Sequence, residues 1–175
     1  MSLSASERSL LRLSQARRAD LVFFKEGVYL ERVSGRAIDD LRHQACADRL
    51  QLAEDFLGSA DRLMRIRPPM LRVAVGRYYY AMYHAMRAVV YFQTPGDDHE
   101  QHSILPGRTP NDFPNVNFWK NELKNARLRR NQADYDPYPA ADREFRELAT
   151  ALKRQAHALV DEARNYLRLK GCAHL

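Results

Sequence analysis

Apolar residues recur every three or four positions along most of this chain, which is the period of an amphipathic helix. Sustained alternation of apolar and polar residues, the pattern of a half-buried strand, is lacking, as are Asn-Gly and Asp-Gly turns. The pattern therefore predicts an all-α protein, an up-and-down bundle of four to five helices. The predicted helices cover approximately residues 4–32, 38–63, 70–92, 117–131 and 145–166.

The third predicted helix differs from the others because its apolar residues almost surround the helical wheel, so we expect it to be central and the most buried. After it, a segment rich in Pro, Gly, Asn, Asp and His predicts a long loop with one turn of helix near Ile104. The second predicted helix has a narrower core face, made of Ile38, Leu41, Ala45, Leu52, Phe56, Ala60 and Leu63.

Gly35 interrupts the helical pattern and divides the chain. We assign residues 1–33 to an amino-terminal helical extension and residues 34–170 to the helical bundle. The full length of 175 residues is about that of one domain, so a single core is expected.

The chain has a net charge of +6, and Arg greatly outnumbers Lys, which favours bidentate contacts to phosphate. RNA or a nucleotide is therefore a candidate partner, although an Arg-rich solvated surface would give the same balance. Cys46 and Cys172 are the only cysteines, so neither a disulfide framework nor a paired-Cys zinc site is predicted. No apolar run approaches the roughly 20 residues of a membrane span. We expect a cytoplasmic protein that has no membrane contact and no cofactor.

Polar side chains share one face of the central helix at spacings of three and four. Burying Arg or His costs several kcal/mol unless the group is paired. This polar seam must therefore face a cleft, a subunit interface or acidic partners such as Asp48, Glu54 and Asp55, or its members must satisfy one another. The seam consists of Arg77, Tyr80, His84, Arg87 and Tyr91.

Basic residues dominate the fourth predicted helix and form a stripe that could follow a phosphate backbone. Trp119 and Tyr135 would be available for stacking on unpaired bases. A solvated helix face is the alternative interpretation. The stripe consists of Lys120, Lys124 and Arg127, and Arg129 and Arg130 extend the positive charge into the following turn.

The loop after the central helix contains His99 and His102 among acidic residues, which raises the question of a metal site. A His-x-x-His pair in a loop has no fixed geometry for presenting both rings, so we predict no metal site and a packing role for histidine. The acidic neighbours are Asp97, Asp98 and Glu100.

Three motifs together resemble HEPN domains, a helical family. They are Tyr-Tyr-Ala-Met-Tyr-His at 79–84, Glu-Gln-His-Ser-Ile at 100–104 and Arg-Arg-Asn-Gln-Ala-Asp-Tyr-Asp-Pro at 129–137. The resemblance covers residues 40–168 and implies a helical bundle that is usually dimeric. Many HEPN domains are metal-independent RNA-cleaving toxins, or stand beside a minimal nucleotidyltransferase that neutralises them.

Ribonuclease members of that family carry an Arg, often followed by a polar residue, and then a His, with four to six residues between the Arg and the His. Arg130 and Asn131 match the first part, but Tyr135 stands where the His is expected. A Tyr with a pKa near 10 is a poor general base at neutral pH. His84, two helical turns from Arg77, is the other candidate for proton chemistry.

Two functional hypotheses follow. In the first, the chain is a HEPN-like homodimer, a toxin-antitoxin component of ribonuclease-type ancestry that binds RNA or a nucleotide. If it cleaves RNA, Arg130 would stabilise the pentacoordinate phosphate, Asn131 would orient it, and Tyr135 or His84 would move the proton. In the second, the chain is a non-catalytic helical module that partners a minimal nucleotidyltransferase. Arg130 would then pair with Asp134 or Asp136, and Tyr135 would fill the core.

Overall fold

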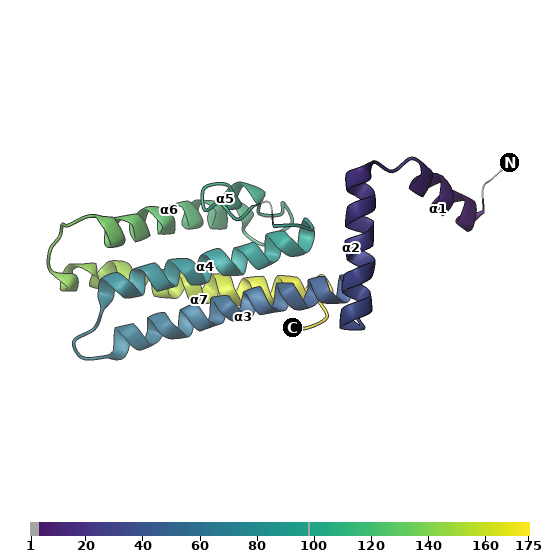
Figure 1. The fold of residues 1–175 in the computed structure, drawn as a ribbon. Helices are drawn as coiled ribbons and strands as arrows, with labels where there is room; N and C mark the ends of the chain where they lie inside the picture. Colours follow the sequence, from purple (N-terminus) through teal and green to yellow (C-terminus); the bar gives the residue numbers. More distant parts are fainter. Residues whose placement is uncertain (1–3, 98) are drawn as a thin grey trace. The chain divides into compact units, whose positions relative to one another are not determined.

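The computed structural model describes residues 4–97 and 99–175, and Figure 1 shows their fold. Every regular element in these residues is a helix, so the prediction of an all-α protein is confirmed. Within the same residues, no helix combines the length and the apolar character needed to cross a membrane. The elements in chain order are α1 (Ala5–Ser14), α2 (Arg18–Ser34), α3 (Ile38–Arg65), α4 (Leu71–Gln93), α5 (Leu105–Arg108), α6 (Val116–Tyr135), the 3-10 helix η1 (Asp142–Phe145) and α7 (Arg146–Leu169).

The chain divides into two compact units, with the boundary after Leu41. The first unit contains α1, α2 and the beginning of α3. The second contains the rest of α3 and all later helices.

The first unit has two helices where the sequence pattern predicted one. Ser4 and Glu7 form the expected capping box, in which the Glu7 N–H donates to Ser4 Oγ at 3.2 Å. A second helix begins shortly afterwards, because the Asp20 carboxylate accepts a hydrogen bond from the Arg17 N–H at 3.1 Å. Periodicity continues across this break, so the pattern alone does not reveal it. Gly35 ends α2 with a φ of 66°, a left-handed conformation that glycine adopts without strain.

No residue of α1 or α2 is buried. Large apolar side chains of both helices remain exposed, among them Leu10, Phe23, Val28 and Tyr29. The hydrophobic core therefore lies in the second unit, where every buried apolar residue is found from Cys46 onward in the described chain.

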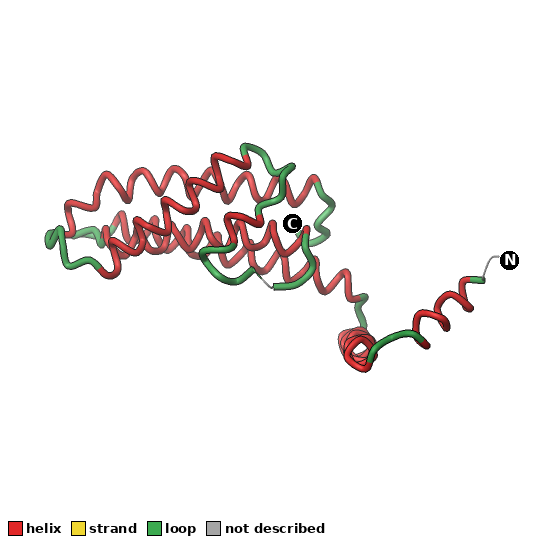
Figure 2. The backbone as a smooth tube through the Cα atoms, turned by 90° about the horizontal axis from the view of Figure 1, so that it is seen from above, coloured by secondary structure: helices red, strands yellow, loops and turns green. Residues whose placement is uncertain are grey.

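The second unit is built around α4. Figures 1 and 2 both show α3, α4, α6 and α7 lying side by side. α4 packs against α6 and α7, and contacts such as the Phe56–Tyr80 ring stack join it to α3. It contributes more buried residues than any other helix, including Tyr78, Met82 and Met86, so the predicted central helix is confirmed.

The core face of α3 matches the predicted face only in part: Ala60 is buried and Phe56 and Leu63 pack against the core, but most of the buried residues belong to the adjacent stripe. Its small side chains, such as Cys46 and Ala53, allow close approach of the neighbouring helices. Bulkier residues lie beside this contact, and Leu52 is 41% exposed. Of the predicted face only Ala60 is buried. The buried residues of α3 are Cys46, Ala47, Leu50, Ala53, Leu57 and Ala60.

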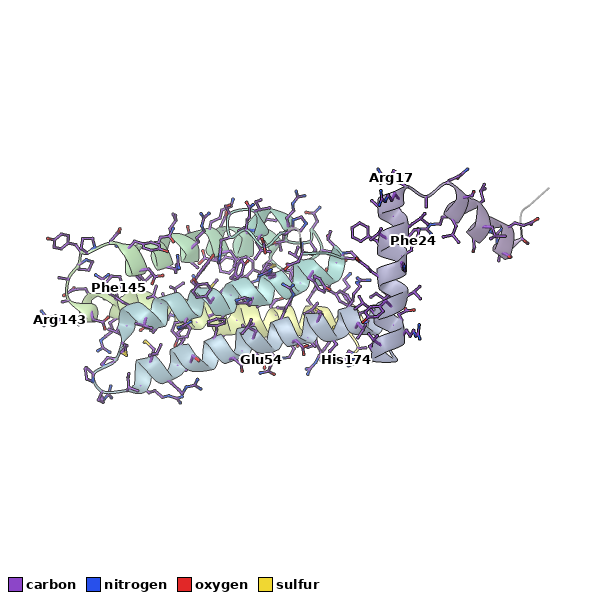
Figure 3. The ribbon with its side chains drawn as sticks, viewed as in Figure 1. Arg17, Phe24, Glu54, Arg143, Phe145 and His174 are labelled. Carbon is purple, nitrogen blue, oxygen red and sulfur yellow. The ribbon has the colours of Figure 1, made fainter. Side chains whose placement is uncertain are left out.

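The amino terminus of α4 is tied to the segment between α6 and α7. The Asp142 carboxylate accepts hydrogen bonds from the N–H groups of Leu71 at 2.7 Å and Arg72 at 2.9 Å. The Arg72 guanidinium donates to backbone carbonyls at the end of α6 and in the following loop, and lies 4.3 Å from the centre of the Phe145 ring. Figure 3 shows Phe145 at this end of the second unit. These contacts fix the end of α6 relative to α4.

The loop after α4 is held by Asp97. Its carboxylate pairs with Arg49, at 2.9 Å, and with Arg87. Burial would raise the pKa of Asp97, but hydrogen bonds from Arg87 and Arg49 outweigh it, so the pKa lies below its usual value. α5 provides the predicted turn near Ile104. Asp98, the other aspartate considered as a metal ligand, lies outside the described residues.

Candidate functional site

Arg130 lies on α6, and its guanidinium reaches the facing side of α4. Nη2 donates to the Tyr80 hydroxyl at 2.8 Å, and Nη1 donates to the Tyr135 hydroxyl at 3.1 Å and to Asn131 Oδ1 at 3.2 Å. Nε lies 2.7 Å from the Asp134 carboxylate, at an angle that makes the contact an ion pair without a hydrogen bond. Only 20% of the Arg130 side chain is exposed, so these neighbours hold the guanidinium in one orientation. We call this group the Arg130 cluster.

The Arg130 cluster joins residues that the sequence pattern placed in separate groups. Arg130, Asn131 and Tyr135 come from the closing motif, and Tyr80 comes from the polar seam. Tyr135 is 70% exposed, so the prediction that it fills the core is wrong. Asp134, rather than Asp136, is the ion-pair partner of Arg130.

An open hollow of about 290 Å³ lies next to the Arg130 cluster. Arg77 stands at its edge, and its guanidinium lies 5.4 Å from the centre of the Phe56 ring. Among the described residues Arg77 has no carboxylate partner, so its charge is available to a ligand. The lining residues are Val73, Gly76, Arg77, Tyr80, Arg130 and Asp134.

A larger groove of about 540 Å³ lies between α3 and α4. Val73 and Arg77 line both this groove and the smaller hollow, so the two are neighbours. Sequence reasoning missed the groove because it assigned the apolar residues of α3 to the core. The lining residues are Leu52, Asp55, Phe56, Ser59, Arg62, Leu63, Val73 and Arg77.

His102 packs against the tyrosines of α4. Its Nδ1 lies 2.5 Å from the Tyr79 hydroxyl, and its ring stacks on Tyr83 with 4.1 Å between centroids. This agrees with the predicted packing role. Burial lowers the pKa of His102, and the positive charges of Arg130 and Arg127 lower it further. The ring is therefore neutral at pH 7.

His84 belongs to a different set of contacts. Its ring is parallel to that of Phe56 within 3°, with 5.2 Å between centroids. Burial, followed by the charges of Arg87, Arg49 and His102, lowers the pKa of His84 to about 4. The His84 ring also stacks beside Tyr80 of the Arg130 cluster, with 6.5 Å between centroids, but none of the hydrogen bonds of Arg130 goes to His84.

The polar seam of α4 separates into parts with different partners. Tyr80 and Arg77 line the hollow, whereas Arg87 pairs with Asp97 and anchors the loop. Arg49 lies over the ring of Tyr91, the last member of the seam, 4.8 Å from its centre. None of the acidic residues suggested as partners of the seam forms an ion pair with it among the described residues. Glu54 pairs with Arg164, Asp48 accepts a hydrogen bond from Gln44, and Asp55 lines the groove.

The two arginines that extend the basic stripe of α6 lie on different sides of the helix. Arg129 lines a separate hollow, of about 250 Å³, that faces α7, whereas Arg130 faces α4. Arg127 is half-buried on the side of His102, Lys120 is half-buried, and Lys124 is exposed. Consecutive residues of a helix point in different directions, so Arg129 lies toward α7 and Arg130 toward α4.

Trp119 is only 4% exposed, so the prediction that it stacks on bases is wrong. α6 buries Trp119, Leu123, Ala126 and Ala133 against the core. It also continues through Tyr135, beyond the predicted end at Asn131, which keeps Tyr135 one helical turn from Arg130.

The Arg130 cluster and its hollow together suit an anionic ligand. A guanidinium held in a fixed orientation can bind a phosphate with little ordering cost. A second guanidinium, that of Arg77, stands beside it. Comparison of the chain with protein-family models, with curated proteins and with solved structures found no match.

Proposed function

We propose that this protein is a HEPN-like helical bundle that binds RNA or a nucleotide at the Arg130 cluster. The observation that carries the proposal is the pre-oriented guanidinium of Arg130 beside the unneutralised guanidinium of Arg77, at the edge of an open hollow. The net charge of +6 and the sequence resemblance to HEPN domains support the same ligand class. Such a protein would act as a toxin-antitoxin component.

Metal-independent RNA cleavage is part of this proposal. Arg130 would stabilise the negative charge of the pentacoordinate phosphate, and Asn131 would help to hold the guanidinium in place. The ribose 2′-hydroxyl would attack the phosphorus and lose its proton to water as the bond from phosphorus to the 5′-oxygen breaks. The Tyr135 hydroxyl accepts a hydrogen bond from Arg130, so its own proton is free to be donated to the departing 5′-oxygen, and Tyr135 would regain a proton from water. Tyr135 is thus better placed than His84 for proton transfer.

The test is incubation of the purified protein with mixed cellular RNA in EDTA, at low and at moderate salt. Arg130→Ala is the variant, and Arg168→Ala, which removes an exposed arginine of α7, is the matched control. We expect wild type and control to bind RNA less tightly as salt rises, and Arg130→Ala to lose binding at both salt concentrations. Cleavage that is abolished only by Arg130→Ala would establish a ribonuclease. Absence of both binding and cleavage would contradict the proposal.

The second candidate function is a non-catalytic interaction module that partners a minimal nucleotidyltransferase. The ion pair between Arg130 and Asp134, one turn apart on α6, favours it because a structural role would also explain this contact. In that case Arg130→Ala would lower the unfolding temperature and leave RNA behaviour unchanged. The proposed homodimer can be tested by sedimentation of the wild-type protein.

A further inference from the structure

The groove between α3 and α4 has features of a ligand site that the fold itself does not require. Leu52, Phe56 and Leu63 of α3 line the groove: Leu52 is 41% exposed, and Phe56 and Leu63 pack against the core while each leaves part of its side chain open to the groove. Val73 of α4, which is 40% exposed, closes the same apolar lining from the other side. An apolar recess with a few polar groups at its edge is the usual form of a small-ligand site.

The charges around the groove favour an anion. Two guanidinium groups, those of Arg62 and Arg77, line it, against the single carboxylate of Asp55. Arg62 donates a hydrogen bond to Ser59 Oγ at 2.9 Å, and in the described part of the chain no carboxylate pairs with either arginine. Asp55 offers an acceptor for N–H groups of a ligand, and Gln51 holds it with a hydrogen bond of 3.1 Å.

The groove adjoins the hollow beside the Arg130 cluster. Arg77 and Val73 line both the groove and the smaller hollow that contains Arg130. The combined space has an apolar end on α3 and a polar end where two guanidinium groups, of Arg77 and Arg130, stand against the one carboxylate of Asp134. A nucleotide has the same polarity, with a flat base at one end and a phosphate at the other.

We propose that the groove and the hollow form one binding site for a nucleotide of single-stranded RNA. Its base packs among Leu52, Leu63 and Val73, and its phosphate binds Arg77 and Arg130. This inference rests on the proposed function and extends it by naming the place where the base binds. It assigns to α3 a role in binding, whereas the family resemblance implied site residues in the motif at 129–137, on α6.

The experiment measures binding of AMP by calorimetry, and of a short single-stranded oligoadenylate by fluorescence anisotropy, to the full chain. Adenosine and ribose 5-phosphate are measured beside AMP, and each should bind more weakly because it lacks one end of the ligand. Leu52→Glu and Arg77→Ala should each weaken AMP and oligoadenylate binding by about tenfold or more. Leu128→Glu is the matched control, because Leu128 is 65% exposed on α6 and lines neither space.

Circular dichroism of each variant checks the fold, which we expect to be intact because Leu52 and Arg77 lie outside the buried core. Normal oligoadenylate binding by Leu52→Glu and Arg77→Ala would overturn the inference. If Arg130→Ala still abolished binding in that case, the proposed function would stand without the groove. Equal weakening by Leu52→Glu and Leu128→Glu would also overturn the inference, because it would reveal a general effect of negative charge.

Discussion

Two hydroxyls, an amide and a carboxylate hold the guanidinium of Arg130, and they come from two helices that lie far apart in sequence. Neighbouring arginines have other tasks: Arg87 secures a loop through Asp97, and Arg72 fastens the end of α6 to α4. Residue type alone therefore says little about role in this protein. The partner of each guanidinium decides whether it is structural or available to a ligand.

Tyr80→Phe tests the orientation of Arg130 at the residue scale. The change removes the hydroxyl that accepts a hydrogen bond from Arg130 Nη2 at 2.8 Å and keeps the ring that stacks on Phe56. We expect RNA affinity to fall by about three- to tenfold, the loss of a net hydrogen bond, with little change in fold. Anisotropy with labelled RNA measures the effect. Tyr138→Phe, at a tyrosine that is 76% exposed, serves as the control and should bind normally.

His84 should make the stability of the protein depend on pH. Its pKa is lowered to about 4 by burial and by the charges of Arg87, Arg49 and His102, so the unfolded chain takes up this proton first as pH falls. The free energy of unfolding should therefore decrease between about pH 6.5 and pH 4, and His84 should account for about 1–2 kcal/mol of that loss because its ring is partly exposed.

Urea unfolding at pH 7 and at pH 4.5 measures this loss. His84→Gln should lose less stability between the two pH values than the wild type, whereas the loop variant His99→Gln should behave as the wild type does. An identical loss in wild type and His84→Gln would show that the His84 ring does not resist protonation in the folded state.

At the scale of elements, α4 organises the second unit. It is the most buried helix, and α3, α6 and α7 all contact it. Its amino terminus has no capping side chain of its own, because Met70 stands at that position. Asp142, far along the chain in η1, supplies the missing acceptor. Because η1 directly precedes α7, this cap ties the start of α4 to the start of α7.

Asp142→Ala should therefore destabilise the protein without touching the Arg130 cluster. The N–H groups of Leu71 and Arg72 would lose their acceptor, and removal of such a cap costs about 1–2 kcal/mol. Urea unfolding measures the difference. Glu144→Ala removes an exposed carboxylate of the same 3-10 helix and should change stability by less than about 0.5 kcal/mol. Equal effects of the two variants would rule out the capping role.

At the scale of the whole molecule, the two units differ in how their apolar residues are used. α1 and α2 are amphipathic and bury nothing, whereas the second unit contains the entire core of the described chain. Folding free energy comes mainly from buried apolar area, so stability should reside in the second unit.

Removal of residues 1–36 tests this distribution. We expect the shortened chain to keep its helical signal and a single cooperative thermal transition, within about 5 °C of the full chain, because no core residue is deleted. Circular dichroism during heating measures both properties. A broad or absent transition would show that the first unit contributes substantially to the core.

Hydrophobic periodicity determined that the chain is all helical, which helix is central and where most helices end, because a helix must turn its apolar residues toward one another. The motif at residues 129–137, and not periodicity, singled out Arg130, Asn131 and Tyr135, whose spacing on one helix is fixed locally. Periodicity did not reveal the break between α1 and α2. There the Asp20 side chain accepts a hydrogen bond from the Arg17 N–H and so begins a new helix.

Tertiary structure decided what these residues contact. Trp119 and Tyr135 are both aromatic residues of α6, yet one is buried and the other exposed, because only one faces the core. Part of the predicted apolar stripe of α3 lines a groove, because residues of the adjacent stripe, such as Cys46 and Ala53, are the ones that are fully buried. The Arg130 cluster likewise required α4 to bring Tyr80 within reach of α6. Burial and pairing depend on neighbours that are distant in sequence, and helical spacing carries no information about them.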